Sequence, residues 1–415
     1  MVTVFDLNDP ALLLRDDVVA DPNPLYDELR AHAPVWSVPG QNTFVVSDPE
    51  LIRDAVARTG DFSSNLVALL HRGPNGMLQR FELAPMGDPS HVLAIADPPD
   101  HSVQRRLLQP HLSSSAVRRY EPDLRGIVDR LVDPLLVRGS GDAVELICDP
   151  FPAFALCLVV GFPEADVPSI VAMVSRTALL VDGVTDEAGM ADAAAGAVDL
   201  ITYGAERLDL ALARPPDDST LLRVLAGSVA DGILSRDQAI NILTQLFTAG
   251  TETTTSLIAR SVQTLATHPT LQRQMRDEPE RIPVFLEQVL RHTGPFQFHS
   301  RWASEDTILG DTPIPGGSVV LLMWAAADRC PGVEPSNGEP FNLDDDDGTH
   351  FAFGRGLHFC IGAHLARLEA RLATEQLLAR TTDIRLEPGH PASMRPSLSI
   401  KRMTSLPILV SPTAT

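Results

Sequence analysis

Cysteine is scarce in this chain, with four residues among 415. They are Cys148, Cys157, Cys330 and Cys360, and no two of them have the spacing of a CxxC motif. Four cysteines are too few for the disulfide framework of a secreted protein of this length. Cys148 and Cys157 stand in apolar sequence, and we expect both to be small residues of a hydrophobic core.

The chain also lacks long hydrophobic runs and an excess of positive charge. No stretch reaches the ~20 uninterrupted apolar residues of a membrane span, and the first residues lack the basic start of a signal peptide. We therefore expect a cytoplasmic protein with no membrane partner. Lysine and arginine total 33 against 54 aspartates and glutamates, and this net charge of −21 argues against a nucleic-acid partner.

Hydrophobic residues make up 44% of the sequence, which is enough for a large core. Segments with helical periodicity dominate, and strand-like segments are few. The helical segments include 23–33, 49–59, 100–112, 116–136 and 281–294, and the strand-like ones 43–48, 316–326, 383–388 and 406–411. We predict a mainly α fold with a small β-rich lobe. Because no linker marks a boundary, residues 1–415 are expected to form a single domain.

The longest predicted helix begins at Ser235-Arg236-Asp237-Gln238, which fits the S-x-x-Q capping box, and runs to His268. Its length is roughly 50 Å, enough to cross a domain. Its middle, "TAGTETTT", combines a glycine, which costs about 1 kcal/mol in a helix, with threonines, which are poor helix formers. It is either an exposed threonine-rich turn or a local distortion that lines a polar pocket in a buried helix.

Cys360 has unusual surroundings. The sequence after it has an apolar stripe of helical spacing at Leu365, Leu368, Leu372 and Leu377, which places the cysteine at a helix N-terminus. Free amides and the helix dipole favour a thiolate there, and nearby glycines allow the backbone to approach closely. Such a thiolate serves as a metal ligand or a nucleophile.

Three chemistries are open to this cysteine. No cysteine-hydrolase signature surrounds it. A zinc site could combine Cys360 with His350, His358 or His364, but structural zinc sites usually have paired ligands on both sides. Heme iron needs a single axial cysteine and a large apolar slot, which the long helix could cover.

The motif Phe353-Gly354-x-Gly356-x-His358-x-Cys360-x-Gly362 resembles the heme-binding signature of the cytochrome P450 family. The resemblance extends over essentially the whole chain. It implies a P450 fold that holds heme b (iron protoporphyrin IX) between the long oxygen-activating helix and the helix that follows the cysteine loop. Cys360 would ligate the iron, and Phe353, Gly354, His358 and Gly362 would contact the cofactor.

Other segments resemble the family in the same order. In "TAGTETT", Glu252 and Thr253 match the acid and alcohol that deliver protons, and Ala249 and Gly250 make room for O2. The matching positions on the propionate side of the heme are His101, Arg105, Arg301, His350 and His358. Arginine and histidine suit this task because charge-assisted hydrogen bonds compensate two buried carboxylates.

The implied activity is a heme-thiolate monooxygenase that inserts one oxygen of O2 into a small apolar substrate, by hydroxylation or epoxidation. Electrons would come from a ferredoxin and its reductase, so that NAD(P)H acts only indirectly, and we expect a monomer. A basic patch of Arg105, Arg106, Arg355, Arg367 and Arg371 would receive the ferredoxin, unless these arginines are scattered. The alternative function is a non-catalytic heme-binding or ligand-binding protein.

Two positions depart from the family pattern. The usual E-x-x-R motif is Gln288-Val289-Leu290-Arg291 here, and Pro340 stands where an arginine often precedes a phenylalanine. Glu287 lies about 100° around the helix from Gln288 and cannot take its place without a shift of register. We expect Gln288 and backbone carbonyls to hold Arg291, unless Arg329 supplies the second guanidinium.

The substrate is not identified by the sequence. By resemblance, the walls of its pocket come from four segments rich in leucine, valine, methionine and phenylalanine. These segments are residues 66–93, 179–184, 247–250 and 296–298.

Overall fold

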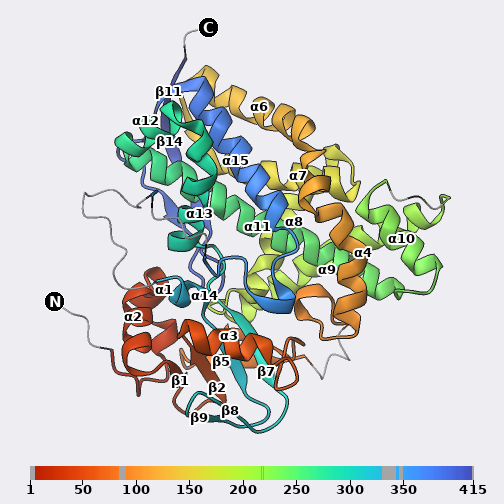
Figure 1. Ribbon diagram of the computed structural model, residues 1–415, viewed down its shortest axis with the longest axis vertical. Helices are drawn as coiled ribbons and strands as arrows, with labels where there is room; N and C mark the ends of the chain where they lie inside the picture. Colours follow the sequence, from red (N-terminus) through yellow and green to blue (C-terminus); the bar gives the residue numbers. More distant parts are fainter. Residues whose placement is uncertain are drawn as a thin grey trace.

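The computed structural model describes residues 5–83, 90–215, 217, 219–329, 343–344 and 349–413. Figure 1 shows a large helical part and a smaller part built around a β-sheet. The predicted mainly α fold with a small β-rich lobe is therefore confirmed. Cys330 and the departure at Pro340 lie outside the described residues.

The sheet of the smaller part has the strand order β1-β2-β10-β7-β3. Its strands are β1 (Val35–Ser37), β2 (Thr43–Val46), β3 (Phe62–Ser63), β7 (His299–Ala303) and β10 (Val319–Leu322). β10 runs parallel to β2 and antiparallel to β7. Two of the strands were predicted, but the end of segment 316–326 forms the short helix α14 (Trp324–Ala327) instead of continuing as strand.

The remaining strands form small sheets. β11 (Thr381–Leu386), β14 (Pro407–Pro412) and β6 (Ser140–Asp142) form a three-stranded sheet, of which the first two were predicted. The others pair in twos: β4 (Ala68–Arg72) with β5 (Leu78–Glu82), β8 (Thr307–Leu309) with β9 (Thr312–Ile314), and β12 (Ser393–Met394) with β13 (Met403–Ser405).

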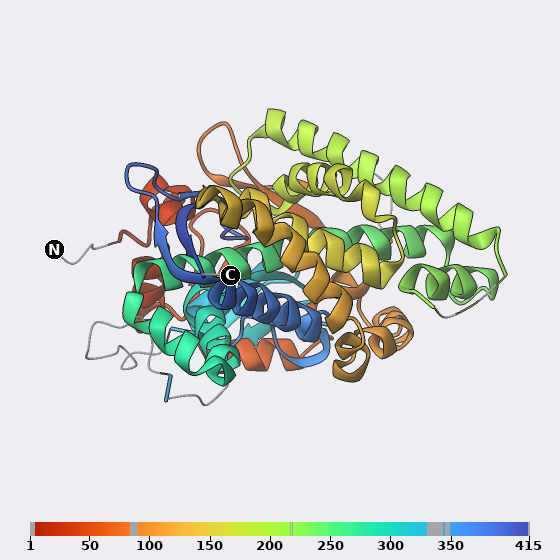
Figure 2. The ribbon, with the colours of Figure 1, turned by 90° about the horizontal axis from the view of Figure 1, so that it is seen from above.

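Helices form most of the larger part, and α9 lies along its outer edge (Figure 2). The segment predicted as one helix over 116–136 is two, because the chain turns at Arg119 and Tyr120. The helices outside the centre are α1 (Asp16–Ala20), α2 (Asn23–His32), α3 (Pro49–Ala57), α4 (Asp100–Leu112), α5 (Ser114–Arg118), α6 (Glu121–Arg138), α7 (Pro150–Val160), α8 (Val167–Thr177), α9 (Glu187–Leu212), α10 (Leu221–Ala230), α12 (Pro269–Asp277) and α13 (Ile282–Thr293).

The long helix α11 (Arg236–Thr267) crosses the centre of the helical part and has the predicted capping box at Ser235 and Gln238. Half of its threonine-rich middle is buried, namely Thr251, Glu252, Thr254 and Thr255, and the whole run is helical, so the exposed-turn interpretation is wrong. The helix is also continuous there, without the expected distortion. Its hydroxyls bond backbone carbonyls instead: Thr253 Oγ1 donates to the carbonyl of Ala249 at 2.6 Å, one turn earlier.

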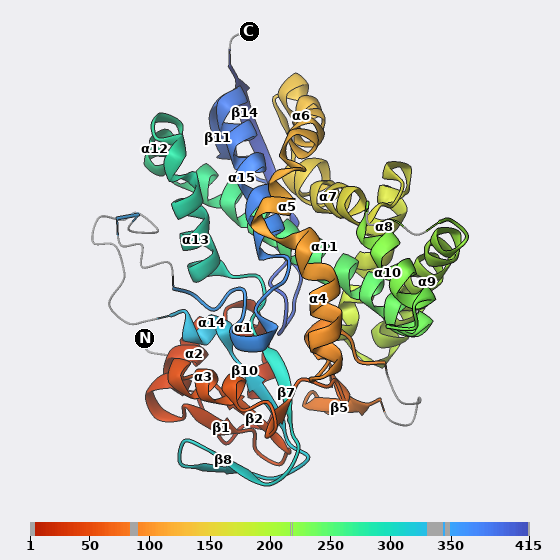
Figure 3. The same cartoon turned by 45° about the vertical axis from the view of Figure 1, so that its right-hand side comes forward.

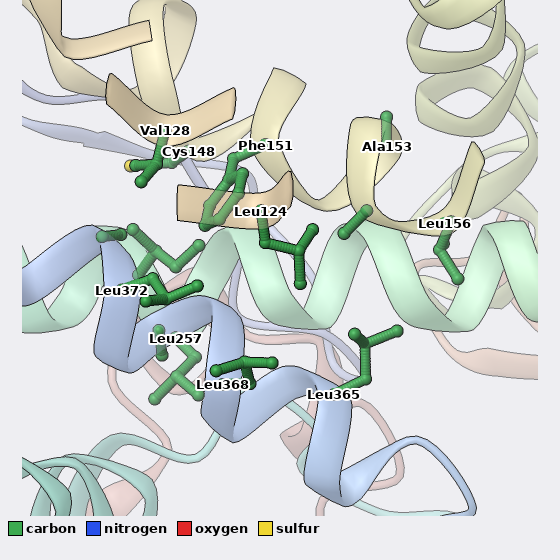
Figure 4. Packing of buried hydrophobic residues seen from close by; sticks show 14 of the residues in the cluster. Leu124, Val128, Cys148, Phe151, Ala153, Leu156, Leu257, Leu365, Leu368 and Leu372 are labelled. Atoms are coloured by element: carbon green, nitrogen blue, oxygen red, sulfur yellow. The ribbon is translucent and has the colours of Figure 1, made fainter. Parts of the chain in front are cut away.

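Helix α15 (Ala363–Arg380) packs beside α11 and buries all four leucines of the predicted stripe. Figure 4 shows Leu365, Leu368 and Leu372 facing the core, with Leu257 of α11 among them. Each buried leucine contributes about 1.5–3 kcal/mol to folding. The predicted burial of Cys148 and Cys157 is confirmed as well. This packing fixes the start of α15, and with it the loop that carries Cys360.

Candidate functional site

The loop before α15 lies between the helical part and the sheet of the smaller part (Figure 3). Gly354 and Gly356 adopt φ values of +67° and +69°, which side chains with a Cβ rarely take. The amide of Cys360 donates to the carbonyl of Phe353 at 2.9 Å, which closes the turn around the thiol. The predicted glycine-rich approach to the cysteine is therefore a tight backbone cradle.

The electrostatics around the sulfur are mixed. Burial raises the pKa of the Cys360 thiol above its ordinary value. The backbone amides of Gly362 and Ala363 and the charges of Arg105 and Arg367 act in the opposite direction. Because the effect of burial is the larger one, the neutral thiol is favoured in the protein alone, whereas a bound metal ion would deprotonate the sulfur outright.

A large cavity opens in front of Cys360. It holds about 1460 Å3 of empty space, part of which is open to solvent. Ala249, Gly250 and Thr253 of α11 line one side, and the cysteine loop lines the other. Apolar side chains form much of the remaining wall: Leu93, Leu112, Leu156, Leu246, Leu257, Leu290, Phe296, Phe353 and Leu365. The slot thus lies between the two helices that the sequence singled out.

Four of the five residues predicted on the propionate side line this cavity: His101, Arg105, Arg301 and His358. Arg301 is 6% exposed and forms no ion pair with any carboxylate in the described part of the chain. Its Nη1 donates only to the carbonyl of the neighbouring Ser300, at 2.9 Å. Burial lowers the pKa of Arg301 to about 10, so the guanidinium still carries its charge at neutral pH.

The two histidines are also short of partners. Their rings lie 4.3 Å apart between centroids, and His358 Nε2 bonds Ser64 Oγ at 2.9 Å. Among the described residues, nothing bonds the buried Nδ1 atoms of His101 and His358 or Nε of the cavity-lining Arg355. Burial, helped by the charge of Arg301, lowers the pKa of His358 to about 3. The rim of the cavity thus carries charged guanidinium groups and neutral imidazole rings, several of whose nitrogens have no hydrogen-bond partner among the described residues.

These residues fit heme. Buried donors normally have acceptors, and two propionates would supply four carboxylate oxygens and two negative charges to this rim. The thiol, the apolar slot and the cationic rim match the iron, the macrocycle and the propionates in turn. No group of three or more histidine, cysteine or acidic side chains suited to a metal occurs in the described residues, which removes the support for a zinc site.

His350 is placed elsewhere. Its Nε2 lies 2.9 Å from Glu287 Oε2, and its Nδ1 accepts the amide of Ala352 at 3.2 Å, so its side chain does not line the cavity. Arg367 binds the same Glu287 through two bonds of 2.7 Å. Burial would raise the pKa of Glu287, but the bonds from Arg367 and His350 lower it to about 2. His350 thus links the cysteine loop to α13.

Of the two positions that depart from the family pattern, the structure describes Gln288. Gln288 is buried on α13, while Glu287 faces the cysteine loop, as the 100° separation between them requires. The expectation that Gln288 and backbone carbonyls hold Arg291 stays a prediction. Arg329 Nε lies 3.4 Å from Asp27 of α2. Pro340 lies outside the described residues.

The acid and the alcohol of α11 face different surroundings. Thr253 lines the cavity together with Ala249 and Gly250. Glu252 is 1% exposed, and its carboxylate does not reach the cavity lining. Its oxygens lie 2.7 Å from Arg395 Nη2 and 3.2 Å from Arg402 Nε. The structure thus does not bring the two predicted catalytic side chains to the same wall.

Glu252 belongs to a buried ionic cluster of five residues, here called the Glu252 cluster. Arg395 Nε lies 3.2 Å from Asp182 Oδ2, and Arg402 Nη2 lies 2.6 Å from Asp149 Oδ1. Three acids against two arginines leave a formal charge of −1. Burial raises the pKa of Glu252 and Asp149, and raises that of Asp182 to about 6. The cluster therefore tends to keep one proton.

Sequence reasoning missed several cavity residues. Glu369 of α15 lines the cavity and is 2% exposed, and its Oε2 has no partner among the described residues. Burial raises the pKa of Glu369 well above the usual range, which favours the neutral carboxyl over the carboxylate. Its spacing from Leu365 and Leu372 was the available signal, because it puts an acid on the apolar face of the helix. Gln245 and Trp324 also line the cavity and had no such signal.

Only some of the expected walls line the cavity. Leu93, Ala249, Gly250 and Phe296 do so. The hairpin of β4 and β5 and the residues 179–184 do not line it. The amide of Arg72 on β4 donates to the carbonyl of Thr185 at 3.2 Å, so the hairpin contacts the chain directly after residues 179–184. No helix in the described part of the chain is long and apolar enough to cross a membrane.

Comparisons with known proteins agree with this site. The family model described as Cytochrome P450 matches residues 206–391. Cytochrome P450 144 of Mycobacterium tuberculosis is 35% identical over 393 residues, covering 94% of this chain and 89% of that protein. Cytochrome P450 monooxygenase PikC of Streptomyces venezuelae is 30% identical, covering 95% and 92%.

A solved structure shows the same fold. Cytochrome P450 CREJ, in complex with (4-ethylphenyl) dihydrogen phosphate, superposes with a TM-score of 0.83 at 25% identity, covering 99% of this chain and 100% of the other. The relatives that match over most of this chain, the fold, and the site around Cys360 all indicate the same family. The chain belongs to the cytochrome P450 family and is therefore an oxidoreductase that uses heme and incorporates molecular oxygen, with electrons from a reductase partner.

Proposed function

We propose that this protein hydroxylates or epoxidises a small apolar substrate, with electrons from a ferredoxin, and that it works as a single-domain, cytoplasmic monomer. The observation that carries the proposal is the cavity between Cys360 and α11, with cations at its rim that lack carboxylate partners. One relative, PikC, is a monooxygenase by name, and the lining of the cavity fits the same cofactor. Both points speak against the non-catalytic alternative.

Cys360 would hold the iron, and His101, Arg105, Arg301 and His358 would hold the propionates. When bound, the heme supplies the activation of O2 for insertion into a carbon–hydrogen or carbon–carbon double bond. The amides of Gly362 and Ala363 stabilise the negative charge on the sulfur of Cys360. The residues of Phe353 to Gly362 thus position the ligand and set its electron donation.

Thr253 and Glu252 would handle protons in different places. The Thr253 hydroxyl lies on the cavity wall, where rotation away from the Ala249 carbonyl lets it hold a water or donate a proton. Glu252 takes up a proton at its carboxylate inside the Glu252 cluster, where burial raises its pKa. Delivery from Glu252 requires its carboxylate to leave Arg395 and Arg402, so these two arginines would control the proton supply.

The substrate would be apolar. The cavity lining includes the apolar residues Leu93, Ala94, Leu246, Ala249 and Phe296, and the residues that α11 contributes carry no charge. Such a wall gains affinity from buried hydrophobic area and penalises an ionised group. We place the substrate in this region, on the side of the cavity that faces α11.

The ferredoxin would dock over the loop that precedes α15. Leu357 and Phe359 are both 37% exposed there, with Arg105 bonded to the Phe359 carbonyl at 2.8 Å and Arg106 exposed on the same helix. An acidic partner matches these arginines, and the two apolar side chains supply contact area. Of the five arginines first grouped here, Arg367 and Arg371 are already paired with acids of this chain.

The purified protein tests the proposal directly. Heme-loaded wild type, reduced under carbon monoxide, should give the absorption of a thiolate-ligated heme. Cys360→Ala should lose that absorption and all oxygenation, because neither of the other two cysteines in the described part of the chain lines the cavity. Cys157→Ala, in the core behind α11, should keep both.

A thiolate-type spectrum in Cys360→Ala would overturn the assignment of the iron ligand. Turnover is then measured with a surrogate ferredoxin and reductase and a panel of apolar compounds. Oxygenated product supports the enzyme, whereas heme loading with no product from any compound favours the non-catalytic alternative.

A further inference from the structure

Leu93 has an unusual backbone conformation. Its φ is +44°, and no other non-glycine residue in the described part of the chain has a positive φ. The left-handed region is unfavourable for a residue with a Cβ, and strain of this kind gathers at functional sites. Leu93 is also 6% exposed and lines the cavity. The strain is therefore located in the wall of the site.

Side-chain amides hold this backbone in place. The amide of Leu93 donates to Gln104 Oε1 at 2.7 Å, and Gln104 Nε2 donates to the carbonyl of His91 at 3.4 Å. The amide of Ala94 donates to Gln245 Oε1 at 3.1 Å. One glutamine comes from α4 and the other from α11, so two helices fix the same short segment.

The glutamines are placed where a replacement is costly. Gln104 is fully buried, and its oxygen is the acceptor for a buried amide that the short 3-10 turn at Leu93–Ile95 cannot satisfy itself. On α11, Asn241 lies one turn before Gln245 and donates to the carbonyl of Ser90 at 3.4 Å. The segment is thus held by three amide side chains along its length.

A purely structural cap would not need a leucine at this position. Glycine adopts a positive φ without strain, whereas leucine is tolerated only when its surroundings enforce the conformation. What leucine adds is a branched side chain beside Ala94 on the wall, near Leu246, the residue that follows the clamping Gln245. The strained residue therefore also places a bulky side chain in the wall of the cavity.

We propose that Leu93 sets the size of substrate that the cavity accepts, and that Gln104 and Gln245 are positioning residues that keep its side chain on the wall. The inference rests on the proposed function, because the cavity is taken as the substrate site. Without the Gln104 acceptor, the strained backbone relaxes toward negative φ and the leucine leaves the wall. Loss of either the leucine or its clamp then widens the same region.

The test uses heme-loaded enzyme and two iron-binding probes, imidazole and 4-phenylimidazole, whose binding is followed by absorption. Imidazole is small enough to ignore the wall and reports whether the heme and Cys360 are intact. In Leu93→Ala, the ratio of 4-phenylimidazole affinity to imidazole affinity should rise about tenfold, the effect of a few methylene groups in a pocket. Ile95→Ala, in the same turn but outside the lining, is the matched control and should leave the ratio unchanged.

Gln104→Met keeps the volume of the side chain and removes the acceptor. It should raise the affinity ratio in the same direction, and Gln104→Glu, which retains an acceptor oxygen, should restore most of the wild-type ratio. The control is Gln109→Met, on the exposed side of α4. The double variant Leu93→Ala with Gln104→Met should match Leu93→Ala alone, because the clamp has no further side chain to position.

The outcomes separate the claims. An unchanged ratio in Leu93→Ala overturns the role of the leucine, and additive effects in the double variant overturn the role of Gln104. If Gln104→Met fails to fold, Gln245→Met tests the same clamp through Ala94. Failure of the proposed function is distinct, because wild type would then give no oxygenated product with ferredoxin and reductase, while the imidazole and 4-phenylimidazole affinities would still report on Leu93 and Gln104.

Discussion

Two buried groups of charge flank α11, and they are built differently. The rim of the cavity collects Arg301, Arg355, His101 and His358, and none of the four has an ion pair with a described carboxylate. The Glu252 cluster, outside the cavity lining, joins three acids and two arginines through four ion pairs of 2.6–3.2 Å. The cations of the rim have no acid of the described chain to pair with, whereas the charges of the Glu252 cluster are ion-paired with one another, although Nε of both of its arginines lacks a hydrogen bond.

The difference follows from the cost of burying charge. A buried ion without a partner is unfavourable by several kcal/mol, so an unpaired cationic rim persists only where a bound anion compensates it. In the Glu252 cluster, acids and arginines of the same chain form ion pairs with one another. These pairs connect α11 to the region of the C-terminal strands and to Asp182. The first group therefore contributes to binding of the cofactor, and the second contributes to folding and proton control.

We expect the largest effect on stability from a change in the Glu252 cluster. Arg395→Met leaves three acids facing one arginine, and breaking a buried pair from one side costs about 3–5 kcal/mol. We expect the unfolding free energy to fall by that amount at pH 7.5, measured by denaturant unfolding.

Arg385→Met on β11 is the control, because its side chain is 63% exposed and lies 3.7 Å from Asp383. Removal of a surface pair changes stability by about 0.5 kcal/mol or less. Equal losses in the two variants would contradict the distinction between buried and surface charge.

The rim should respond in the opposite manner. Arg301→Met removes a cation that only a ligand compensates, so we expect heme affinity to fall roughly 100-fold, or about 3 kcal/mol. The heme-free protein should keep or gain stability, because an unpaired buried charge is gone. Heme transfer to a competing apo-protein measures the affinity, and denaturant unfolding measures the heme-free stability.

Arg80→Met is the matched control, since Arg80 pairs with Glu82 on β5 and does not line the cavity. Its heme affinity should equal that of wild type. A loss of stability in heme-free Arg301→Met as large as the loss of heme affinity would show that the arginine has a partner within the chain.

The pH dependence of stability also distinguishes the Glu252 cluster from the cavity rim, because Asp182 of the cluster has a raised pKa. Burial, partly offset by Arg395 and Arg402, raises its pKa to about 6 from an ordinary 3.8. Because the folded pKa is the higher one, its contribution to stability is present below about pH 4 and is lost as the pH rises through about 6. The shift corresponds to about 2–3 kcal/mol.

Between pH 4 and pH 7, the free energy of unfolding of wild type should therefore fall by about 2–3 kcal/mol more than that of Asp182→Asn. Unfolding free energies measured across this range give the difference directly. Parallel curves for wild type and variant would mean that Asp182 is ionised throughout, with both arginines fully neutralising the cluster.

The smallest effect is expected at the surface. Arg106→Glu should slow reduction of the heme by an acidic ferredoxin about tenfold at low salt, because rim charges act on encounter. The difference should shrink as salt screens the charges. Arg119→Glu, exposed on the turn after α5, is the control for charge alone. Equal slowing in both would show a general charge effect without a defined docking patch.

The sequence predicted the elements with strong local signals. The capping box at Ser235 located the start of α11, and the leucine spacing after Cys360 located α15. The cavity between them followed from the resemblance. Burial of the threonine run was a tertiary effect, because α7 and the turn around Cys148 cover it, and propensity alone favours no helix there.

The partners of charged side chains were harder to predict. His350 and Glu287 meet across 63 positions, and Arg395 meets Glu252 across 143. Nothing local in the sequence encodes such pairs, because they depend on how distant elements pack. The conformation of Leu93 was equally hidden, since leucine ordinarily avoids a positive φ and only the surrounding glutamines enforce it.

The bond from the Thr253 hydroxyl to the Ala249 carbonyl has a consequence for speed. A kinked helix would offer a permanent free carbonyl, and changing it would require collective backbone motion on the microsecond scale or slower. Here one side-chain torsion covers or uncovers the carbonyl while the helix stays intact. Because exposed rotamers exchange within picoseconds to nanoseconds, we expect this torsion to change far faster than a typical catalytic turnover.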